Sequence, residues 1–352
     1  MIKVQFFKDS GKGDEMEDIT RVVVDAMGGD NAPKAPVQAA VDAVNERKDI
    51  HVILVGQKEK INRELKNYGP YPADCLQVVD AREVIETAEM PTKAIMEKRD
   101  SSIVKGLRLV KSGEADAFVS SGNSGAVMVG GTAIIRKLRG VERAPLAPLL
   151  PTSKGVSLLV DCGANVDARP THLVQFARMG SIYMENIMEI KNPKVAIVNI
   201  GAEEEKGNAL VKETFPLLKE CKDINFIGSI ESREILTGYA DVIVCEAFTG
   251  NVILKLIEGV AKTLVHELKG SIYGSLRTKI GGLLVKPAMK ETFSKLDSSE
   301  HGGAPLLGLN GLVVKTHGSA NAKEIKNGIF QCADFKKQKI NEIIDKKLNG
   351  ES

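Results

Sequence analysis

The chain has 352 residues, 43% of them hydrophobic, and a formal net charge of +2. A chain of this length and composition can bury a large core, and its near-neutral charge argues against a general nucleic-acid-binding protein. Only 4% of the residues are aromatic and none is Trp, which argues against base-stacking surfaces. We therefore expect no nucleic-acid partner.

The five cysteines are scattered, and none belongs to a CxxC pair. Cys162 and Cys245 lie in or beside apolar runs, which suits core thiols of a reducing compartment better than disulfides or zinc ligands. The sequence contains no secretory signal and no apolar span of about 18 residues. These features predict a cytoplasmic protein whose cysteines are not zinc ligands.

The first 20 residues are polar and lack a sustained hydrophobic period, so we expect a flexible N-terminal extension. Structure is predicted to begin with a buried strand over Arg21–Ala26. This strand leads into a loop that contains Gly28, Gly29 and Asp30 but does not read GxGxxG. The dinucleotide-binding fingerprint is therefore absent.

Short apolar runs then recur along the chain with helical patterns between most of them. The predicted strands are His51–Val55, Leu76–Val79, Pro148–Leu150, Val156–Val160, Val195–Asn199, Asn225–Gly228 and Asp241–Cys245, with a strand-like pair over Leu306–Lys315 and a final helix over Ala320–Leu348. This alternation predicts an α/β fold with a mostly parallel sheet that is covered on both faces. Because the sequence shows no linker, we expect one domain over residues 21–348.

Two stretches of the chain repeat one pattern, Gly113–Gly131 and Gly238–Gly259. Each reads Gly-x-Ala-Asp, a short strand, a Gly-Asn turn and then a helix. The first turn of a helix has free backbone N–H groups and favours negative charge, and open α/β sheets bind ligands at the carboxyl ends of their strands. The pair predicts a shared phosphate or polyanion site, and the alternative is that each turn only caps its helix.

Other glycine-rich loops follow the remaining strands, and they contribute backbone donors and small polar side chains. The predicted substrate- or phosphate-binding residues are Gly28, Gly29, Asp30, Ser120, Gly122, Asn123, Ser124, Gly163, Asn165, Thr249, Gly250, His301 and His317. One of these loops carries Lys206, which could equally be a solvated lysine beside three glutamates, and each histidine could equally cap a turn. Small donors with a lysine suit a phosphate that is either the reactant or a group merely held in place.

The segment from Thr249 to Lys290 departs from the α/β alternation because it is long, helical and without a strand. It predicts a projecting helical hairpin over about residues 251–290. Leu276, Ile280, Leu283 and Leu284 form an apolar stripe among glycines and cations. Such a stripe is either core or an exposed tip that contacts an anionic membrane or a partner helix.

Taken together, several motifs resemble the phosphate acyltransferase (PlsX) family of bacterial phospholipid synthesis. They are VDAMGGDNAP, SSGNSGA, GVERAPLAPLLPT, GANVDARPTHLVQFARMGS, EEEKGN, AFTGNV and HGGAPLLGL, and the resemblance covers about Arg21 to Leu348. Family members usually read Asp-Gly where this chain has Glu246-Ala247, so the role of Glu246 is left open.

The resemblance implies transfer of a long fatty acyl group from acyl carrier protein to inorganic phosphate. The acyl-phosphate product would feed the membrane glycerol-3-phosphate acyltransferase. The resemblance further implies a homodimer with a Rossmann-like three-layer α/β/α core and peripheral membrane association, and no metal or organic cofactor. The family's catalytic lysine and asparagine fall on Lys206 and Asn251.

In the implied mechanism, the glycine loops and Lys206 hold phosphate while Asn251 donates to the thioester oxygen. The basic run Arg136, Lys137, Arg139 and Arg143, or the hairpin cations, would dock the acidic carrier. Two alternatives have a related architecture or the same hairpin: a dehydrogenase of the isocitrate or isopropylmalate type that uses NAD, and a non-catalytic membrane-associated binding protein.

Overall fold

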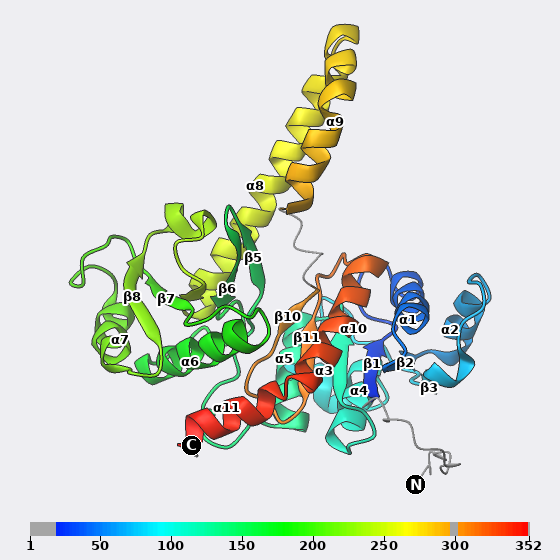
Figure 1. The fold of residues 1–352 in the computed structure, drawn as a ribbon. Coiled ribbons are helices and arrows are strands. Elements are labelled where there is room, and N and C mark those ends of the chain that lie inside the picture. Colours follow the sequence, from blue (N-terminus) through cyan, green and yellow to red (C-terminus); the bar gives the residue numbers. More distant parts are fainter. Residues whose placement is uncertain (1–18, 296–301, 351–352) are drawn as a thin grey trace.

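The structure, a computed structural model, describes residues 19–295 and 302–350 (Figure 1). Most of the expected N-terminal extension and His301 lie outside the described residues. Thr20 was assigned to the extension, but it is buried and opens the first strand, where its N–H donates to the carbonyl of Asp49 at 2.8 Å.

The strands divide between two mixed sheets. The first sheet has the order β10-β11-β4-β1-β2-β3 and the second the order β5-β6-β9-β7-β8. The first is built from β1 (Thr20–Asp25), β2 (Ile50–Gly56), β3 (Leu76–Asp80), β4 (Ala117–Ser120), β10 (Ala304–Pro305) and β11 (Leu312–Lys315). The second is built from β5 (Leu149–Thr152), β6 (Gly155–Val160), β7 (Lys194–Val198), β8 (Asn225–Ile230) and β9 (Val242–Val244).

In each sheet only the strand at one edge is antiparallel to its neighbour, β10 to β11 and β5 to β6. The mostly parallel α/β fold is confirmed, with its strands in two sheets. The division follows the stretch between β4 and β5, after which the chain starts a new sheet with the β5–β6 hairpin.

Helices connect the strands and cover the sheets. They are α1 (Lys34–Glu46), α2 (Lys58–Leu65), α3 (Pro91–Glu97), α4 (Ser102–Lys111), α5 (Ser124–Gly130), α6 (Pro170–Asn186), α7 (Ala209–Glu220), α8 (Ala247–Tyr273), α9 (Leu276–Lys295), α10 (Ala322–Lys337) and α11 (Ile340–Asn349). Short 3₁₀ segments cover Ala73–Cys75 and Ser232–Thr237, and a π-helical turn covers Gly131–Ile135.

The apolar runs of the sequence are continuous because both faces of each sheet are buried. In β1, Val22 and Val24 pack into one core cluster while Val23 packs into another on the opposite face. The first cluster also contains residues of the second sheet, among them Leu158 and Val195, so the two sheets share one core. Successive side chains of a strand alternate between faces, which is why fully apolar strands are typical of buried parallel sheets.

The predicted C-terminal helix is two helices. Lys339 adopts a left-handed conformation with φ of 52° between α10 and α11. This break lets α11 turn away from the first sheet and pack against α6 of the second, where Lys347 pairs with Glu185 at 3.1 Å (Figure 1). The prediction of one uninterrupted helix over Ala320–Leu348 was therefore wrong.

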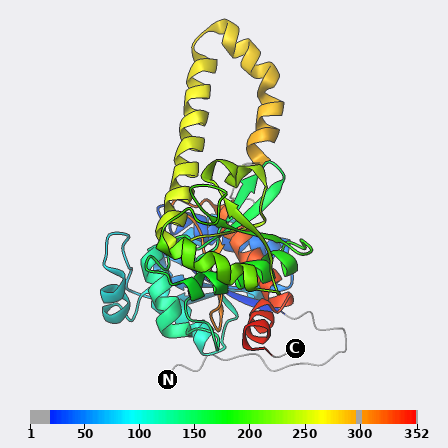
Figure 2. The same cartoon turned by 90° about the vertical axis from the view of Figure 1, so that its left-hand side faces the viewer.

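The predicted hairpin is formed by α8 and α9, which project together from the body of the molecule (Figures 1 and 2). Its four predicted tip residues are exposed, from 59% for Ile280 to 78% for Leu284. They are therefore not core residues of this chain. Among the described residues, no helix is both long and apolar enough to cross a bilayer.

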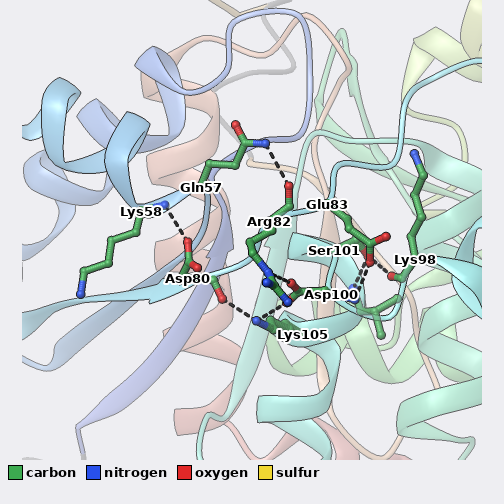
Figure 3. Close-up of polar contacts among 10 residues, drawn as sticks. Gln57, Lys58, Asp80, Arg82, Glu83, Lys98, Asp100, Ser101 and Lys105 are labelled. Carbon is green, nitrogen blue, oxygen red and sulfur yellow. Dashed lines mark hydrogen bonds and ion pairs between the residues drawn. The ribbon is translucent and has the colours of Figure 1, made fainter.

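Several cations around the segment from β3 to α4 pair with neighbouring acids and carbonyls (Figure 3). Arg82 pairs with Asp100 at 2.6 Å, and Lys105 contacts both Asp100 and the carbonyl of Asp80. Lys98 lies on the same segment and pairs with Glu89. These contacts fasten the segment between β3 and α4, so we assign it a structural role.

Candidate functional site

A cavity of about 660 Å³ lies where the two sheets and the base of α8 meet. The second sheet contributes Cys162 and Gly163 after β6, and α8 contributes Phe248 and Asn251. The first sheet contributes Lys315, the last residue of β11, with the loop that follows it. The cavity therefore lies at the carboxyl ends of strands from both sheets, where α/β folds bind ligands.

The repeated Gly-Asn turns both reach this cavity, although they follow strands of different sheets. The first turn follows β4 and contributes Ser124, while the second follows β9 and contributes Asn251. The single sheet predicted from the sequence would contain both turns, whereas the structure places them in two sheets. They meet because the two sheets present these ends to the same cavity.

The cavity is lined by both apolar and polar side chains. The apolar ones come from β5, the nearby β6–α6 loop and the base of α8, namely Leu149, Leu150, Val166, Phe248, Leu254 and Ile257. The polar and charged ones include Asn251, Lys315 and His317 as well as Lys255, Glu258, Lys262 and Glu324. Such a mixed lining suits a ligand with an apolar chain and a polar head.

Asn251 lies in the first turns of α8, and its neighbour Gly250 lets that helix pack closely on the end of β6. A Cβ on Gly250 would lie 1.9 Å from the carbonyl oxygen of Asp161, so only glycine allows the helix to pack this closely on the end of β6. Asp161 is fully buried, and its carboxylate accepts hydrogen bonds from the backbone N–H groups of Leu146 and Asn165 at 2.9 and 2.8 Å. Among the described residues, the Asn251 amide has no hydrogen-bond partner.

We expect Gly250→Ala to lower the free energy of unfolding by about 1–3 kcal/mol or more, because the new methyl group forces helix α8 away from β6. The matched control is Gly259→Ala, since a Cβ there meets nothing within 4 Å. Thermal melts of the two variants measure the difference. Equal melting temperatures would contradict the close packing at Gly250.

The free helix ends predicted for anion binding are already capped by side chains of the protein. The Asn123 carbonyl oxygen accepts from the N–H of Ala126 at 2.9 Å and caps α5. Glu246 accepts from the N–H of Thr249 at 3.0 Å and caps α8. A carboxylate at the start of α8 also places negative charge where the phosphate was expected. At these two ends, capping is the role that the structure displays.

The loops of the first sheet pack on one another beside the cavity. A Cβ on Gly28 would lie 2.6 Å from the N atom of Gly122, and Gly29 has a φ of 91°. The N–H of Asp30 donates to the carbonyl of Gly318 at 2.8 Å. Ser120 donates to the buried Asp25 at 2.7 Å.

Of the predicted binding residues that the structure describes, three line the cavity, namely Ser124, Gly163 and His317, together with the predicted catalytic residue Asn251. The other described ones do not line it: Gly28, Gly29, Asp30, Ser120, Gly122, Asn123, Asn165, Thr249 and Gly250. Thr249 lines a second, smaller cavity instead. Ligand binding by all these residues stays a prediction.

Lys206 is not brought together with Asn251 in the cavity. It belongs to the loop after β7, next to Gly207 and Asn208, which line a smaller cavity of about 310 Å³ on another face of α8. Its ammonium is exposed and pairs with Glu203 at 2.8 Å, and this hydrogen bond raises the pKa of Lys206. The structure thus shows an ion pair where the sequence left the choice between a solvated and a catalytic lysine.

His317 joins the base of α8 to the loop after β11. Its Nε2 lies 3.5 Å from both the Glu258 carboxylate and the Lys255 ammonium, and Lys255 and Glu258 pair at 2.7 Å. Its Nδ1 lies 2.8 Å from the hydroxyl of Ser319. These contacts hold the loop against α8 at the cavity wall.

Lys315 is the cavity residue that the sequence analysis missed. It is 6% exposed, and among the described residues its ammonium donates only to the carbonyl of Thr316. Burial lowers the pKa of Lys315 to about 8. The available signal was a lysine at the end of the apolar run LNGLVVK, directly before Thr-His-Gly.

Among the residues with assigned positions, no three His, Cys, Asp or Glu side chains gather as they would around a metal ion. The buried thiols of Cys162 and Cys245 have pKa values raised by burial, so neither is an activated nucleophile.

Comparison with known proteins identifies relatives over nearly the whole chain. The family described as "Fatty acid synthesis protein" matches residues 20–343. The phosphate acyltransferase of Alkaliphilus oremlandii is 50% identical over 330 residues, which cover 94% of this chain and 98% of that protein. The phosphate acyltransferase of Clostridium acetobutylicum is 45% identical over 327 residues, covering 93% and 98%.

The fold is similar to that of a solved phosphotransacetylase. The EutD phosphotransacetylase from Staphylococcus aureus superposes with a TM-score of 0.59 at 17% identity, covering 90% of this chain and 94% of that one. At this identity the likeness establishes the shared α/β architecture alone.

Proposed function

Because the chain belongs to the fatty acid synthesis protein family, whose curated relatives are phosphate acyltransferases, we propose that it transfers a fatty acyl group from acyl carrier protein to inorganic phosphate. The chain is an acyltransferase of this family. The observation that carries the substrate assignment is the cavity whose lining combines apolar side chains with Asn251 and Lys315. An acyl thioester likewise combines an apolar chain with a polar reacting group.

The proposed reaction is a direct displacement. An oxygen of phosphate attacks the thioester carbon, Asn251 donates to the carbonyl oxygen as it becomes negative, and the C–S bond then breaks. The acyl group leaves as acyl-phosphate for phospholipid synthesis, and the carrier's pantetheine sulfur leaves as a thiolate. Donors placed to stabilise the oxyanion are the main source of catalysis in such acyl transfers, and desolvated phosphate needs no protein nucleophile.

Lys206 is the lysine that family resemblance proposes for phosphate. This role requires its ammonium to exchange Glu203 for phosphate. We expect Lys206→Ala to raise the KM for phosphate by about tenfold or more, the loss of one charge-assisted hydrogen bond, with a smaller change in the KM for acyl carrier protein. Steady-state kinetics with each substrate varied in turn measure this, with Lys206→Arg as the control for charge without the compact ammonium. A change confined to the carrier KM would assign Lys206 to docking.

We infer a homodimer that associates peripherally with the inner face of the cell membrane. The homodimer is supported by an exposed apolar stripe on α8, which a helix of the second copy could cover. The stripe has four-residue spacing and consists of Val252, Leu256, Val260, Leu264 and Leu268. The tip residues Leu276, Ile280, Leu283 and Leu284 lie on α9 of the hairpin that projects from the body of the molecule (Figure 2), where contact with a membrane would leave the cavity free.

The acidic carrier needs a basic docking surface, and we propose the run after α5 for it. Arg136, Arg139 and Arg143 are exposed, whereas Lys137 donates to the carbonyl of Glu142. Charges at the rim of such an interface act mainly on association rate and salt dependence.

The test of the proposed function is incubation with acyl carrier protein bearing a fatty acyl group, with and without inorganic phosphate. We expect free carrier thiol to appear only with phosphate, together with an equimolar amount of acyl-phosphate. A parallel reaction with NAD and a hydroxy acid addresses the dehydrogenase alternative, which predicts an absorbance change of the nicotinamide. Phosphate-independent thiol release would make the protein a thioesterase and overturn the proposal.

A further inference from the structure

We propose that Lys315 is a phosphate-binding residue of the cavity, with its buried ammonium facing the anionic substrate. The assignment rests on the proposed transfer to phosphate and names the residue that attracts it.

The position of Lys315 follows from the register of the first sheet. Lys315 ends β11 and pairs with Ser120 at the end of β4, so it lies at the carboxyl edge of the sheet among the glycine loops. It lines the same cavity as Asn251 and Gly163. A lysine here can act on a ligand that also contacts the Asn251 amide.

Among the described residues the Lys315 ammonium forms no ion pair, although Glu324 and Asp25 lie near enough to favour its charged form. Its ammonium has three donors, and among the described residues only the Thr316 carbonyl accepts from it. The nearby charged groups are Asp25 on β1, Glu324 on α10 and Lys255 on α8. Burial raises the pKa of Asp25, and its oxygens already accept from Ser120 and the N–H of Met27.

A buried ammonium without an ion partner is unfavourable and is retained where a ligand supplies the missing charge. Lys206 pairs with Glu203, and Asn123 and Glu246 each accept from one N–H group at the start of α5 and α8. Lys315 is therefore the cavity group best placed to bind a phosphate dianion.

The same shortage of partners predicts how stability responds to pH. The pKa of Lys315 is lowered from 10.5 to about 8, so at pH 7 the folded protein holds a proton that it binds less well than the unfolded chain does. The charge thus destabilises the ligand-free fold below pH 8, and this cost disappears as the pH rises through 10.5. Lys315→Met should consequently melt at an equal or higher temperature than wild type at pH 7, and this advantage should shrink above pH 8. A structural lysine predicts the opposite, a lower melting temperature.

The decisive experiment measures binding of inorganic phosphate by calorimetry and the KM values of both substrates, for wild type, Lys315→Met, Lys315→Gln and Lys262→Met. Lys262 is the matched control, because it lines the same cavity but is exposed. We expect both Lys315 variants to weaken phosphate binding and to raise the KM for phosphate by about 10- to 100-fold, because one charge-assisted hydrogen bond is lost. In Lys262→Met, phosphate binding and the KM for phosphate should each change by less than about threefold.

Several outcomes would overturn the assignment. The first is an unchanged phosphate affinity in the Lys315 variants, and the second is an equal loss of phosphate affinity in Lys262→Met. The third is a rise in the KM for acyl carrier protein alone, which would place the carrier's own phosphopantetheine phosphate at Lys315. Failure of both Lys315 variants to fold would make Lys315 structural. The two proposals fail separately: phosphate binding without transacylation removes the proposed function alone, and transacylation with an unchanged phosphate KM in Lys315→Met removes only this inference.

Discussion

Asn251→Ala should slow acyl transfer by about 100- to 1,000-fold, the usual result of removing one oxyanion donor. The side chain lines the cavity and, among the described residues, makes no hydrogen bond to the protein. Its loss should therefore leave the melting temperature within about 2 °C of wild type, since an exposed, unbonded side chain contributes little to stability. The measurement is kcat with acyl carrier protein and phosphate both saturating.

The control is Asn251→Asp, which keeps the size of the side chain but replaces its amide donor with a carboxylate. We expect this variant to be at least as slow as Asn251→Ala, because a negative charge opposes the developing oxyanion. A folded Asn251→Ala enzyme with near-normal kcat would remove Asn251 from the mechanism.

Replacing Ile280 and Leu284 together with glutamate should release the protein from anionic vesicles. Each side chain is more than half exposed in the structure, so the change leaves the core intact. Burying one such side chain in a membrane is worth about 1.5–3 kcal/mol, so losing two should weaken partitioning by about 100-fold or more. Vesicle flotation measures the loss, and acyl transfer to phosphate in solution should continue.

The matched control places the same two charges on the body of the molecule, at the exposed Met90 and Met96. This variant should float with the vesicles as wild type does. Equal release of both double variants would mean that added negative charge, and not loss of the apolar tip, governs binding. Unfolding of the Ile280 and Leu284 variant would place these residues in an interface.

Local sequence was sufficient to predict the type of most elements. The short apolar runs around Val22–Val24 and Val242–Val244 favoured buried strands, and the absence of such runs after Thr249 indicated the hairpin now formed by α8 and α9. The C-terminal helix was predicted without its break because a single left-handed residue, Lys339, leaves no mark in the hydrophobic pattern.

The candidate site was predicted in part. The glycine loops and Asn251 were identified from their motifs, and four of the predicted residues line one cavity. Lys315 was missed because an isolated lysine at the end of a strand gives no periodic signal. Lys206 was identified by resemblance, but its ion pair with Glu203 depends on how the loop folds back on itself.

The sequence by itself determined the α/β class, the projecting hairpin and the family, because these depend on local periodicity and on motifs that are contiguous in the chain. Only the tertiary structure decided that the strands form two sheets, that Ser124, Asn251 and Lys315 share one cavity, and that Asn123 and Glu246 occupy the helix ends. The physical reason is that burial, close approach and charge compensation arise between residues distant in sequence. Gly250 shows this most directly, since what requires a glycine there is the carbonyl of Asp161 on another strand end.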